Sequence, residues 1–475
     1  PWDKVHALVV GIGVSGYPSA AGLLHVGATV TLVDDRDGDA EREKATILEI
    51  LGATVRLGPG STTADPATLL DGIDLVVTSP GLPPTTPLLV AARAAGIPVL
   101  GEVDLAWRLR DPEHPAPWIG LTGTNGKTTT VEMLASILAA DGLRTAAVGN
   151  IGVSLVDTVL DPQPYDVLAV ELSSHQLHWS PGLALRAAAV LNVEDDHVAW
   201  HGSAALYRDA KAKIYQDCEV ACVYNVEDPV TEELVREADV QEGCRAIGFT
   251  TQIPAVGMVG VVDDVIADRA FVAQRQTSAA ELATLDDLPS RAPHNIANAV
   301  AAATLARAHG VRPGAVREGL RTFRIGGHRI EHVAEIDGVA YVDDSKATNS
   351  HAALASLRAY DSVVWVAGGQ AKGQRYDDLV REIRDRLRAV ILLGVDRGVI
   401  RDALARHAPN VPVVEESGTD TGTMDRVVSA AARQARPGDT VLLAPGCASR
   451  DMFVDYAERG DAFAAAVRRL APGRS

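Results

Sequence analysis

The stretch "WIGLTGTNGKTTTVEMLASILAADG" at residues 118–142 decides the fold class, because an apolar run passes through a glycine-rich turn into a helix pattern. The run at 118–122 is typical of a buried strand. The helix pattern that follows has an apolar side made of Met133, Leu134, Ile137 and Leu138. A strand, a glycine-rich turn and a helix in this order form a common phosphate-binding unit of α/β proteins.

The turn carries the residue types that bind a nucleotide triphosphate. Its backbone N–H groups and the helix N-terminus can surround phosphate oxygens, Lys127 adds a positive charge, and the Thr128 hydroxyl can bind Mg²⁺. The loop is a compact variant of the G-x-x-x-x-G-K-[ST] pattern, since position 121 is leucine where that pattern has glycine. We predict that this loop binds ATP through Gly123, Thr124, Asn125, Gly126, Lys127, Thr128 and Thr129.

A second glycine-rich loop lies near the N-terminus. "GIGVSG" at 11–16 follows the apolar run "HALVV", and Asp34 ends the next strand pattern, as in dinucleotide-binding units. An NAD-dependent oxidoreductase would explain this loop but would leave the loop at 122–129 without a role. Both loops have a role if the first holds the diphosphate of a nucleotide-linked substrate and the second holds ATP.

Acidic residues follow two further strand patterns. Glu171 ends "VLAVE", and the pattern at 187–193 leads to Asp195, Asp196 and His197. Neighbouring strand ends would bring Glu171 and His197 close to Thr128. Carboxylates with one imidazole suit Mg²⁺ or Mn²⁺ better than Zn²⁺. From the residue pattern alone, Lys211 in "YRDAKAKIY" is expected to be an ordinary solvated helix lysine.

Composition excludes several classes of protein. The 475 residues are 47% hydrophobic and carry a net charge of −18, which disfavours a nucleic-acid partner. Apolar runs stay below the roughly 18 residues of a membrane span, and no leader pattern is present, so we expect a soluble, cytoplasmic monomer without a membrane partner. Four scattered cysteines without a CxxC pair predict buried thiols in place of disulfides or a metal site: Cys218, Cys222, Cys244 and Cys447.

Strand patterns alternate with helix patterns along the whole chain, which predicts an α/β fold with mostly parallel sheets. We expect three domains: 1–110 with the first loop, 111–325 with the ATP loop and metal residues, and 326–475 with a further strand–helix alternation. The proline-rich "RDPEHPAPW" at 110–118 is the expected linker between the first two domains.

Ten motifs, in this order along the chain, resemble those of the Mur ligase family. They are GIGVSG (11–16), TGTNGKTT (122–129), GNIG (149–152), ELSS (171–174), DDH (195–197), YRDAK (207–211), HNIAN (294–298), GHRIE (327–331), DDSKATN (343–349) and APGCAS (444–449). The resemblance implies a Rossmann-like N-terminal domain that binds a UDP substrate, a central P-loop ATPase-like domain and a Rossmann-like C-terminal domain that binds an amino acid.

The resemblance also implies a reaction. The family forms amide bonds with ATP through an acyl phosphate, and these motifs match the member that adds D-glutamate to UDP-N-acetylmuramoyl-L-alanine in cytoplasmic peptidoglycan precursor synthesis, with release of ADP and phosphate. A ligase for another amino-acid addition step is the nearest alternative, and the oxidoreductase is the remote one. Folylpolyglutamate-synthetase-like ligases share the ATP loop but lack an N-terminal domain of this kind.

The family's functional residues carry over by position. Catalysis and two Mg²⁺ sites would involve Lys127, Thr128, Glu171, His197 and Lys211, the last as a carbamylated metal ligand. Further ATP contacts would come from Asn295, Asn298, Arg329 and Asp344. The UDP substrate would be bound by Val14, Ser15, Asp34, Arg36, Gly81, Asn150, Ser173 and Gln176. D-Glutamate would be bound by Lys346, Thr348, Lys372, Ser449 and Tyr456.

The residues expected to bind D-glutamate also have a basis in the residue pattern itself. Lys346 and Lys372 each follow a strand pattern, so both can reach one edge of a parallel sheet. "GCASRDMF" follows the strand pattern of "DTVLLAPG" and is expected to open a helix, which would make Ser449 and nearby N–H groups an anion site. These groups together can neutralise two carboxylates.

Overall fold

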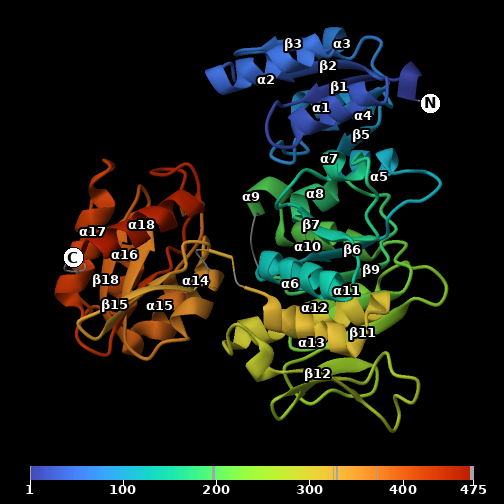
Figure 1. Ribbon diagram of the computed structural model, residues 1–475. Coiled ribbons are helices and arrows are strands. Elements are labelled where there is room, and N and C mark those ends of the chain that lie inside the picture. The colour runs from blue at the N-terminus through green and yellow to red at the C-terminus, as the bar shows by residue number, and fades with distance from the viewer. Residues whose placement is uncertain (1, 195–197, 325, 328–329, 372, 471–475) are drawn as a thin grey trace. The chain divides into compact units, whose positions relative to one another are not determined.

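The computed structural model describes residues 2–194, 198–324, 326–327, 330–371 and 373–470. The chain divides into two compact units, Pro1–Phe323 and Arg324–Ser475. The described residues form two sheets in the first unit and one in the second (Figure 1). Each sheet is built mainly of parallel strands, and the predicted α/β class is confirmed.

The N-terminal sheet is fully parallel, with the strand order β3-β2-β1-β4-β5. Its strands are β1 (His6–Val10), β2 (Thr29–Asp34), β3 (Thr54–Leu57), β4 (Leu75–Thr78) and β5 (Val99–Gly101). Its helices are α1 (Gly16–His25), α2 (Asp39–Ile50), α3 (Pro66–Leu69), α4 (Pro87–Ala94) and α5 (Glu102–Leu109). This order places the loop after β1 at the carboxyl edge, where ligands bind in such sheets.

The central sheet has the order β14-β13-β12-β11-β10-β9-β6-β8-β7 and is parallel from β7 to β12. Its parallel strands are β6 (Trp118–Thr122), β7 (Thr145–Gly149), β8 (Val167–Glu171), β9 (Ala187–Val190), β10 (Ala221–Asn225), β11 (Arg245–Phe249) and β12 (Met258–Val262). The antiparallel strands β13 (Val265–Asp268) and β14 (Ala280–Thr284) extend it at one side. Every residue of β6, β8 and β9 is buried, as expected of strands covered on both faces.

Three helices of the central domain lie side by side: α6 (Lys127–Ala140), α12 (Pro293–His309) and α13 (Pro313–Thr322) (Figure 1). They approach closely, because a Cβ at Gly319 of α13 would lie 2.4 Å from Cα of Ile137. Ser136 Oγ donates a hydrogen bond to the Gly319 carbonyl at 2.7 Å. The remaining helices are α7 (Leu155–Val159), α8 (Ser174–His178), α9 (Val198–His201), α10 (Ala204–Ala212) and α11 (Pro229–Arg236).

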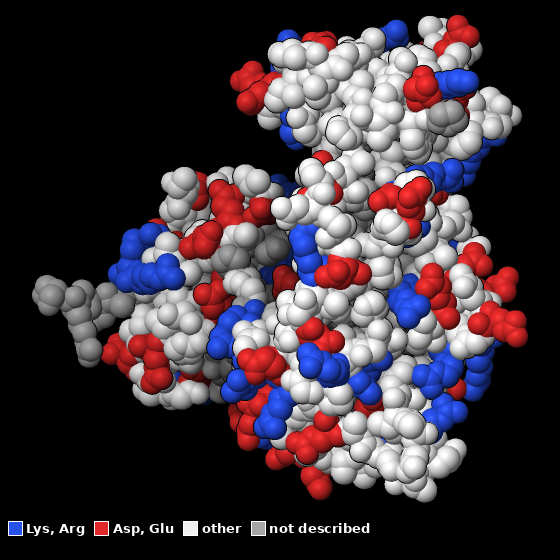
Figure 2. Space-filling model, turned by 45° about the vertical axis from the view of Figure 1, so that its right-hand side comes forward, with Lys and Arg blue, Asp and Glu red and all other residues white. Residues whose placement is uncertain are grey.

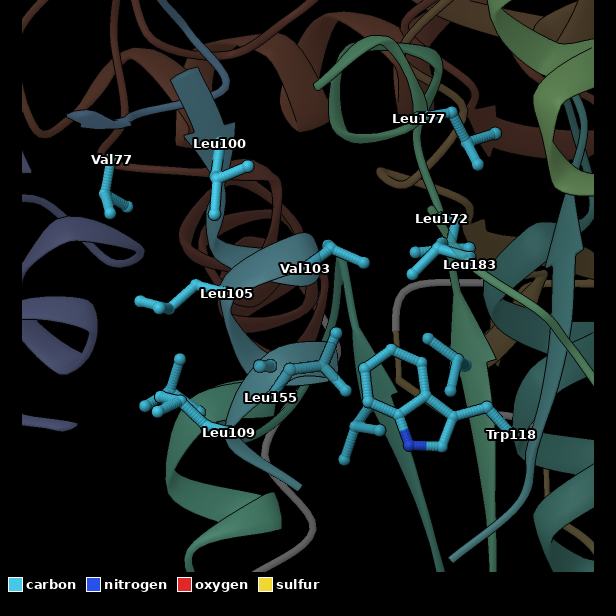
Figure 3. Close-up of a cluster of buried hydrophobic side chains, with 14 of the residues drawn as sticks. Val77, Leu100, Val103, Leu105, Leu109, Trp118, Leu155, Leu172, Leu177 and Leu183 are labelled. Atoms are coloured by element: carbon cyan, nitrogen blue, oxygen red, sulfur yellow. The ribbon is translucent and has the colours of Figure 1, made fainter. Parts of the chain in front are cut away.

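The two sheets of the first unit share one hydrophobic cluster (Figure 3). Val103 and Leu109 of α5 meet Leu155 of α7 and Trp118 of β6 there. Next to the cluster, the buried Glu102 side chain accepts hydrogen bonds from Ser154 Oγ at 2.7 Å and from the Leu155 N–H at 3.1 Å. Apolar contact and a buried carboxylate therefore join the N-terminal and central sheets.

The second unit has a six-stranded sheet with the order β15-β16-β20-β17-β18-β19, parallel except for the β15–β16 hairpin. Its strands are β15 (Glu331–Ile336), β16 (Val339–Asp343), β17 (Val363–Gly368), β18 (Leu387–Leu393), β19 (Val413–Glu415) and β20 (Thr440–Leu443). Its helices are α14 (Ser350–Leu357), α15 (Asp377–Ile383), α16 (Arg397–His407), α17 (Thr423–Gln434) and α18 (Tyr456–Leu470). Hydrophobic clusters on both faces of this sheet form the core of the unit.

The surface carries both signs of charge. Lysine and arginine are interspersed with aspartate and glutamate over the face that Figure 2 shows, without a large region of one sign. Among the described residues, none of the helices combines the length and the apolar character that crossing a membrane requires.

Candidate active site

The phosphate loop connects β6 to α6 at the carboxyl edge of the central sheet. Gly126 has φ +80° and is the N-cap residue of α6, so the helix begins at Lys127 as the sequence pattern predicts. The Lys127 ammonium group donates hydrogen bonds to the carbonyl oxygens of Gly123, at 2.8 Å, and Thr124, at 2.9 Å. The lysine therefore lies folded across the loop, with its charge at the helix N-terminus.

The segment after β9 holds this loop in place. The Asn125 N–H donates to Asn192 Oδ1 at 2.8 Å, and the Asn125 side chain donates to Glu194 Oε2 at 3.0 Å. Thr124 Oγ1 lies 3.0 Å from the Tyr207 hydroxyl and accepts from the Glu194 N–H at 3.0 Å. Sequence reasoning missed Asn192, Glu194 and Tyr207. The polar residues that follow the strand pattern of β9 were the available signal. If β9 and β6 are neighbours in the sheet, these residues meet the loop after β6.

Glu171 lies at the carboxyl end of β8, opposite Leu121 of β6 in the strand register, and is 1% exposed. Its Oε1 accepts a hydrogen bond from Asn150 Nδ2 at 3.0 Å. Within the described part of the chain, the buried Oε2 atom has no hydrogen-bond partner. A buried carboxylate oxygen without a donor is costly unless a cation binds it, so this atom fits a divalent metal.

Lys211 of α10 is 1% exposed, and the expectation of a solvated helix lysine is therefore wrong. Its Nζ donates to Thr122 Oγ1 at 3.4 Å and lies 4.6 Å from the centre of the Tyr207 ring. The helical pattern could not show this burial, because it arises where α10 packs against the end of β6. The fold thus brings Lys211, Glu171 and the phosphate loop to one edge of the sheet, whereas His197 lies outside the described residues.

Asn295 and Asn298 are both buried on α12, as their spacing on one helix face suggests. Asn298 reaches the phosphate loop, because a Cβ at Gly126 would lie 2.4 Å from Asn298 Oδ1. The α12 helix therefore places a carboxamide directly at the loop. A nucleotide on the loop would meet this group.

The loop at 11–16 has the close packing that its glycines suggest, because a Cβ at Gly16 would lie 1.7 Å from the Gly11 carbonyl oxygen. Asp34 Oδ2 accepts from the Ile12 N–H at 2.7 Å, and the Arg36 guanidinium pairs with the same carboxylate at 2.8 Å. Burial acts to raise the pKa of Asp34, but the hydrogen bonds from Arg36 and Ile12 outweigh it and lower the pKa.

Both oxygens of Asp34 thus accept hydrogen bonds from the chain itself. In the dinucleotide-binding pattern, the acid at this position binds ribose hydroxyls. The other expected UDP-binding residues of this domain lie around the same loop or after β4: Val14 and Gly81 are exposed, and Ser15 is buried.

Three expected substrate-binding residues follow β7 and β8. The Asn150 N–H donates to the Glu171 carbonyl at 2.9 Å, in addition to its side-chain contact with that residue. Ser173 and Gln176 form a capping box at the start of α8, with the Gln176 N–H 3.2 Å from Ser173 Oγ. Ser173 and Gln176 therefore also have a structural role that sequence reasoning did not assign.

In the second unit, the ends of β16 and β20 gather several expected residues. Lys346 Nζ lies 3.9 Å from the centre of the Tyr456 ring, Ser449 is buried, and Thr348 follows in the same loop as Lys346. Asp344 Oδ1 accepts from the Ile330 N–H at 3.3 Å, and Asp344 Oδ2 accepts from Ser356 Oγ. Arg329 and Lys372 lie outside the described residues.

The segment after Ser449 differs from the expectation of a helix. Ser449 accepts hydrogen bonds from the N–H groups of Met452 and Phe453 in a turn, and α18 begins only at Tyr456. Sequence reasoning also missed Arg459, which is 1% exposed. Its guanidinium donates to the Ser345 carbonyl at 2.8 Å and to the Cys447 carbonyl at 3.1 Å, and so joins the loops after β16 and β20.

Comparisons with known proteins match this arrangement of domains. Three family models match the chain in order: "Mur ligase MurD-like, N-terminal domain" at residues 5–101, "Mur ligase middle domain" at 121–306 and "Mur ligase, glutamate ligase domain" at 328–447. Together they cover the phosphate loop, the acidic residues and the C-terminal sheet.

Curated relatives are similar over almost the entire chain. The UDP-N-acetylmuramoylalanine--D-glutamate ligase of Streptomyces coelicolor is 61% identical over 98% of this chain and 98% of its own length. The enzyme of the same name from Mycolicibacterium smegmatis is 45% identical over 97% of this chain and 96% of its own.

Solved structures share the fold at low identity. The UDP-N-acetylmuramate-alanine ligase of Thermotoga maritima is 17% identical with a TM-score of 0.58 and covers 98% of this chain and 99% of its own. A pseudomurein peptide ligase of Methanothermus fervidus is 19% identical with the same TM-score, over 98% of this chain and 100% of its own. The motifs, the three matched domains and the full-length relatives agree, and the chain belongs to the Mur ligase family.

Proposed function

We propose that this chain joins D-glutamate to UDP-N-acetylmuramoyl-L-alanine with ATP. The alanyl carboxylate attacks the γ-phosphorus of ATP, ADP leaves, and an acyl phosphate forms. The amine of D-glutamate then attacks the acyl carbon, an amide bond forms, and inorganic phosphate leaves with one of the former carboxylate oxygens. The observation that carries the proposal is the meeting of the phosphate loop, the buried Glu171 carboxylate and Lys211 at one sheet edge, in a chain 61% identical to a relative named for this reaction.

The phosphate loop supplies charge and positioning to the first step. Lys127 lies at the N-terminus of α6, where its ammonium group and the helix N–H groups can bind the phosphates of ATP. Asn192, Glu194 and Tyr207 hold the loop in position before the nucleotide arrives. Such preorganisation accounts for most of phosphoryl-transfer catalysis, which depends on position and charge neutralisation.

A divalent cation of the Mg²⁺ or Mn²⁺ class would be held by Glu171 and Thr128, since hard cations prefer oxygen ligands. When bound, it would neutralise negative charge on the phosphates. We assign Lys211 to the same site as a carbamate: its neutral amine adds to CO₂, one proton leaves, and a carboxylate replaces the ammonium group. The burial of Lys211 at the carboxyl end of β6, with its Nζ 3.4 Å from Thr122 Oγ1, supports this assignment. His197 would serve a second cation.

The loop at 11–16 is assigned to the diphosphate of the UDP substrate. The match of residues 5–101 to the N-terminal Mur ligase model and the full-length relatives support this assignment over NAD. Asn150, which directly follows β7 and donates a hydrogen bond to Glu171, is assigned to the same substrate. In the second unit, Lys346, Ser449 and Tyr456 are assigned to D-glutamate, whose two carboxylates require cations and donors.

The test is phosphate release from ATP with UDP-N-acetylmuramoyl-L-alanine in the presence of D-glutamate, L-glutamate, diaminopimelate or no amino acid. The proposal predicts release only with D-glutamate and a product heavier by one glutamyl residue. Release only with another amino acid would refute the D-glutamate assignment. If no amino acid supports release, the ligase assignment itself fails, and NADH binding at the loop of 11–16 would then be measured.

A further inference from the structure

Three thiols meet at the edge of the central sheet that lies opposite the phosphate loop. Cys218 precedes β10, Cys222 lies near its start, and Cys244 directly precedes β11. Because these strands run parallel to β6, the amino end of β10 and β11 is the edge away from the loop that follows β6. The three Sγ atoms lie within 4.8 Å of one another, and those of Cys222 and Cys244 are 3.9 Å apart.

Backbone hydrogen bonds fix the two segments that carry this group. The Cys218 carbonyl accepts from the Gln241 N–H at 3.1 Å, and the Gln241 carbonyl accepts from the Cys244 N–H at 3.1 Å. Cys218 and Cys222 are fully buried, whereas Cys244 is partly exposed. The backbone of both segments is therefore held in place by hydrogen bonds, and solvent reaches the group at Cys244.

The strand register disfavours a disulfide between Cys222 and Cys244. Cys222 pairs with Ala246 across β10 and β11, so Cys244 lies two residues away along the neighbouring strand. A strand spacing of about 4.8 Å and two rises of about 3.3 Å put the Cα atoms of such a diagonal pair roughly 8 Å apart. Disulfides join Cα atoms at about 4.4–6.8 Å, so bridging this pair would require the backbone to move.

A metal ion between the sulfurs of Cys222 and Cys244 needs no such movement. Tetrahedral coordination with Zn–S bonds of about 2.3 Å places ligand sulfurs about 3.8 Å apart, which matches the 3.9 Å between Cys222 and Cys244. We propose that Cys218, Cys222 and Cys244 bind one thiophilic metal ion of the Zn²⁺ class, with the fourth position left to water on the side of Cys244. The expected unbridged, buried thiols are confirmed for Cys218 and Cys222, and the proposal adds a metal site that the sequence spacing did not reveal.

The chemistry separates this site from the catalytic one. Thiolates prefer Zn²⁺ and its softer congeners, whereas Mg²⁺ prefers the oxygen ligands at Glu171. Each thiol that binds loses its proton to the buffer as an S–metal bond replaces a water–metal bond. Because each bound sulfur must be deprotonated, metal binding must weaken as the pH falls.

The test is titration of the full-length, reduced and chelator-treated protein with Cd²⁺, which gives an ultraviolet charge-transfer band only when thiolate binds it. The expected result is one Cd²⁺ per chain, which displaces bound Zn²⁺ and is retained in excess Mg²⁺. The band should be lost in Cys222→Ser and Cys244→Ser and kept in Cys447→Ser, a buried cysteine of the other unit. Absence of the band in the unchanged protein, or its persistence in the Cys222→Ser/Cys244→Ser double variant, would overturn the proposal.

A second measurement avoids variants, since buried cysteine substitutions can impair folding. Alkylation of Cys244 in the native protein is followed by mass spectrometry with and without Zn²⁺. A metal ion on its sulfur should slow the modification at least tenfold, whereas equal rates would refute the site. This readout does not depend on ligase activity, so it stands apart from the proposed function.

Discussion

Gly126 is the residue at which the structure makes the sharpest prediction about ATP binding. Its φ of +80° lies in the left-handed region, where an L-residue with a Cβ costs about 1–2 kcal/mol. In Gly126→Ala, the new Cβ would also lie 2.4 Å from Asn298 Oδ1. Because that atom is the end of a side chain, the Asn298 amide is expected to rotate away while α12 keeps its position.

The variant should therefore lose both stability and nucleotide affinity. The backbone term predicts a decrease of about 1–2 kcal/mol in the free energy of unfolding. Displacement of the Asn298 amide removes a hydrogen-bonding group worth about 0.5–1.5 kcal/mol. Together with a strained phosphate loop, this predicts ATP binding weaker by about tenfold.

Gly142 provides a matched control at the other end of α6. It has φ +88°, and a Cβ there would meet nothing within 4 Å. Gly142→Ala should thus cost similar stability without altering ATP affinity. Urea unfolding and binding of a fluorescent ATP analogue measure the two quantities. The reasoning is refuted if Gly126→Ala binds the nucleotide within twofold of the unchanged protein, or if both variants weaken binding equally.

Four further variants test other parts of the structure. Lys127→Ala should lower kcat/KM about a hundredfold or more, since it removes a charged hydrogen-bond donor from the phosphates; turnover within a few fold of normal would contradict the loop assignment. Lys211→Ala should be inactive and regain activity with a small added carboxylic acid that replaces the carbamate; failure of every acid to restore turnover counts against carbamylation. Glu102→Ala should lower the free energy of unfolding by about 1–3 kcal/mol, because Ser154 Oγ and the Leu155 N–H lose their buried acceptor; an unchanged urea midpoint would disprove this. Burial lowers the pKa of His178 from 6.5 to about 4, so the contribution of this residue to the free energy of unfolding is present above pH 6.5 and is lost as the pH falls toward 4. In His178→Gln, the urea midpoint should therefore fall less steeply between pH 6.5 and pH 4. The same slope in the variant and the unchanged protein would exclude the effect.

Sequence patterns predicted the fold where the apolar periodicity of a segment and the turn residues beside it indicate the same element. The strand at 118–122, the turn and the helix that begins at Lys127 were predictable, because apolar runs and glycines act over a few residues. Family membership was predictable for the same reason, since the motifs are short, ordered and specific. Burial of single polar residues was not, because it depends on which elements pack together.

Lys211 and Arg459 illustrate this limit. Each lies in an amphipathic helix at a position that looks solvated, yet both are 1% exposed. Their partners are far away in sequence: Thr122 for Lys211, and Ser345 for Arg459. The three cysteines of the proposed thiophilic site come together in the same way, through the parallel pairing of β10 and β11. Such contacts follow from topology, which spacing along the chain does not contain.

In the proposed reaction, ATP activates the alanyl carboxylate as an acyl phosphate before D-glutamate attacks. Its most direct test uses UDP-N-acetylmuramoyl-L-alanine with ¹⁸O in both oxygens of that carboxylate, together with ATP and D-glutamate. Mass spectrometry of the released phosphate and of the product follows the label. Activation through an acyl phosphate predicts one ¹⁸O in each phosphate and one ¹⁸O in the new amide. Unlabelled phosphate, with both ¹⁸O atoms still on an unligated substrate, would contradict it.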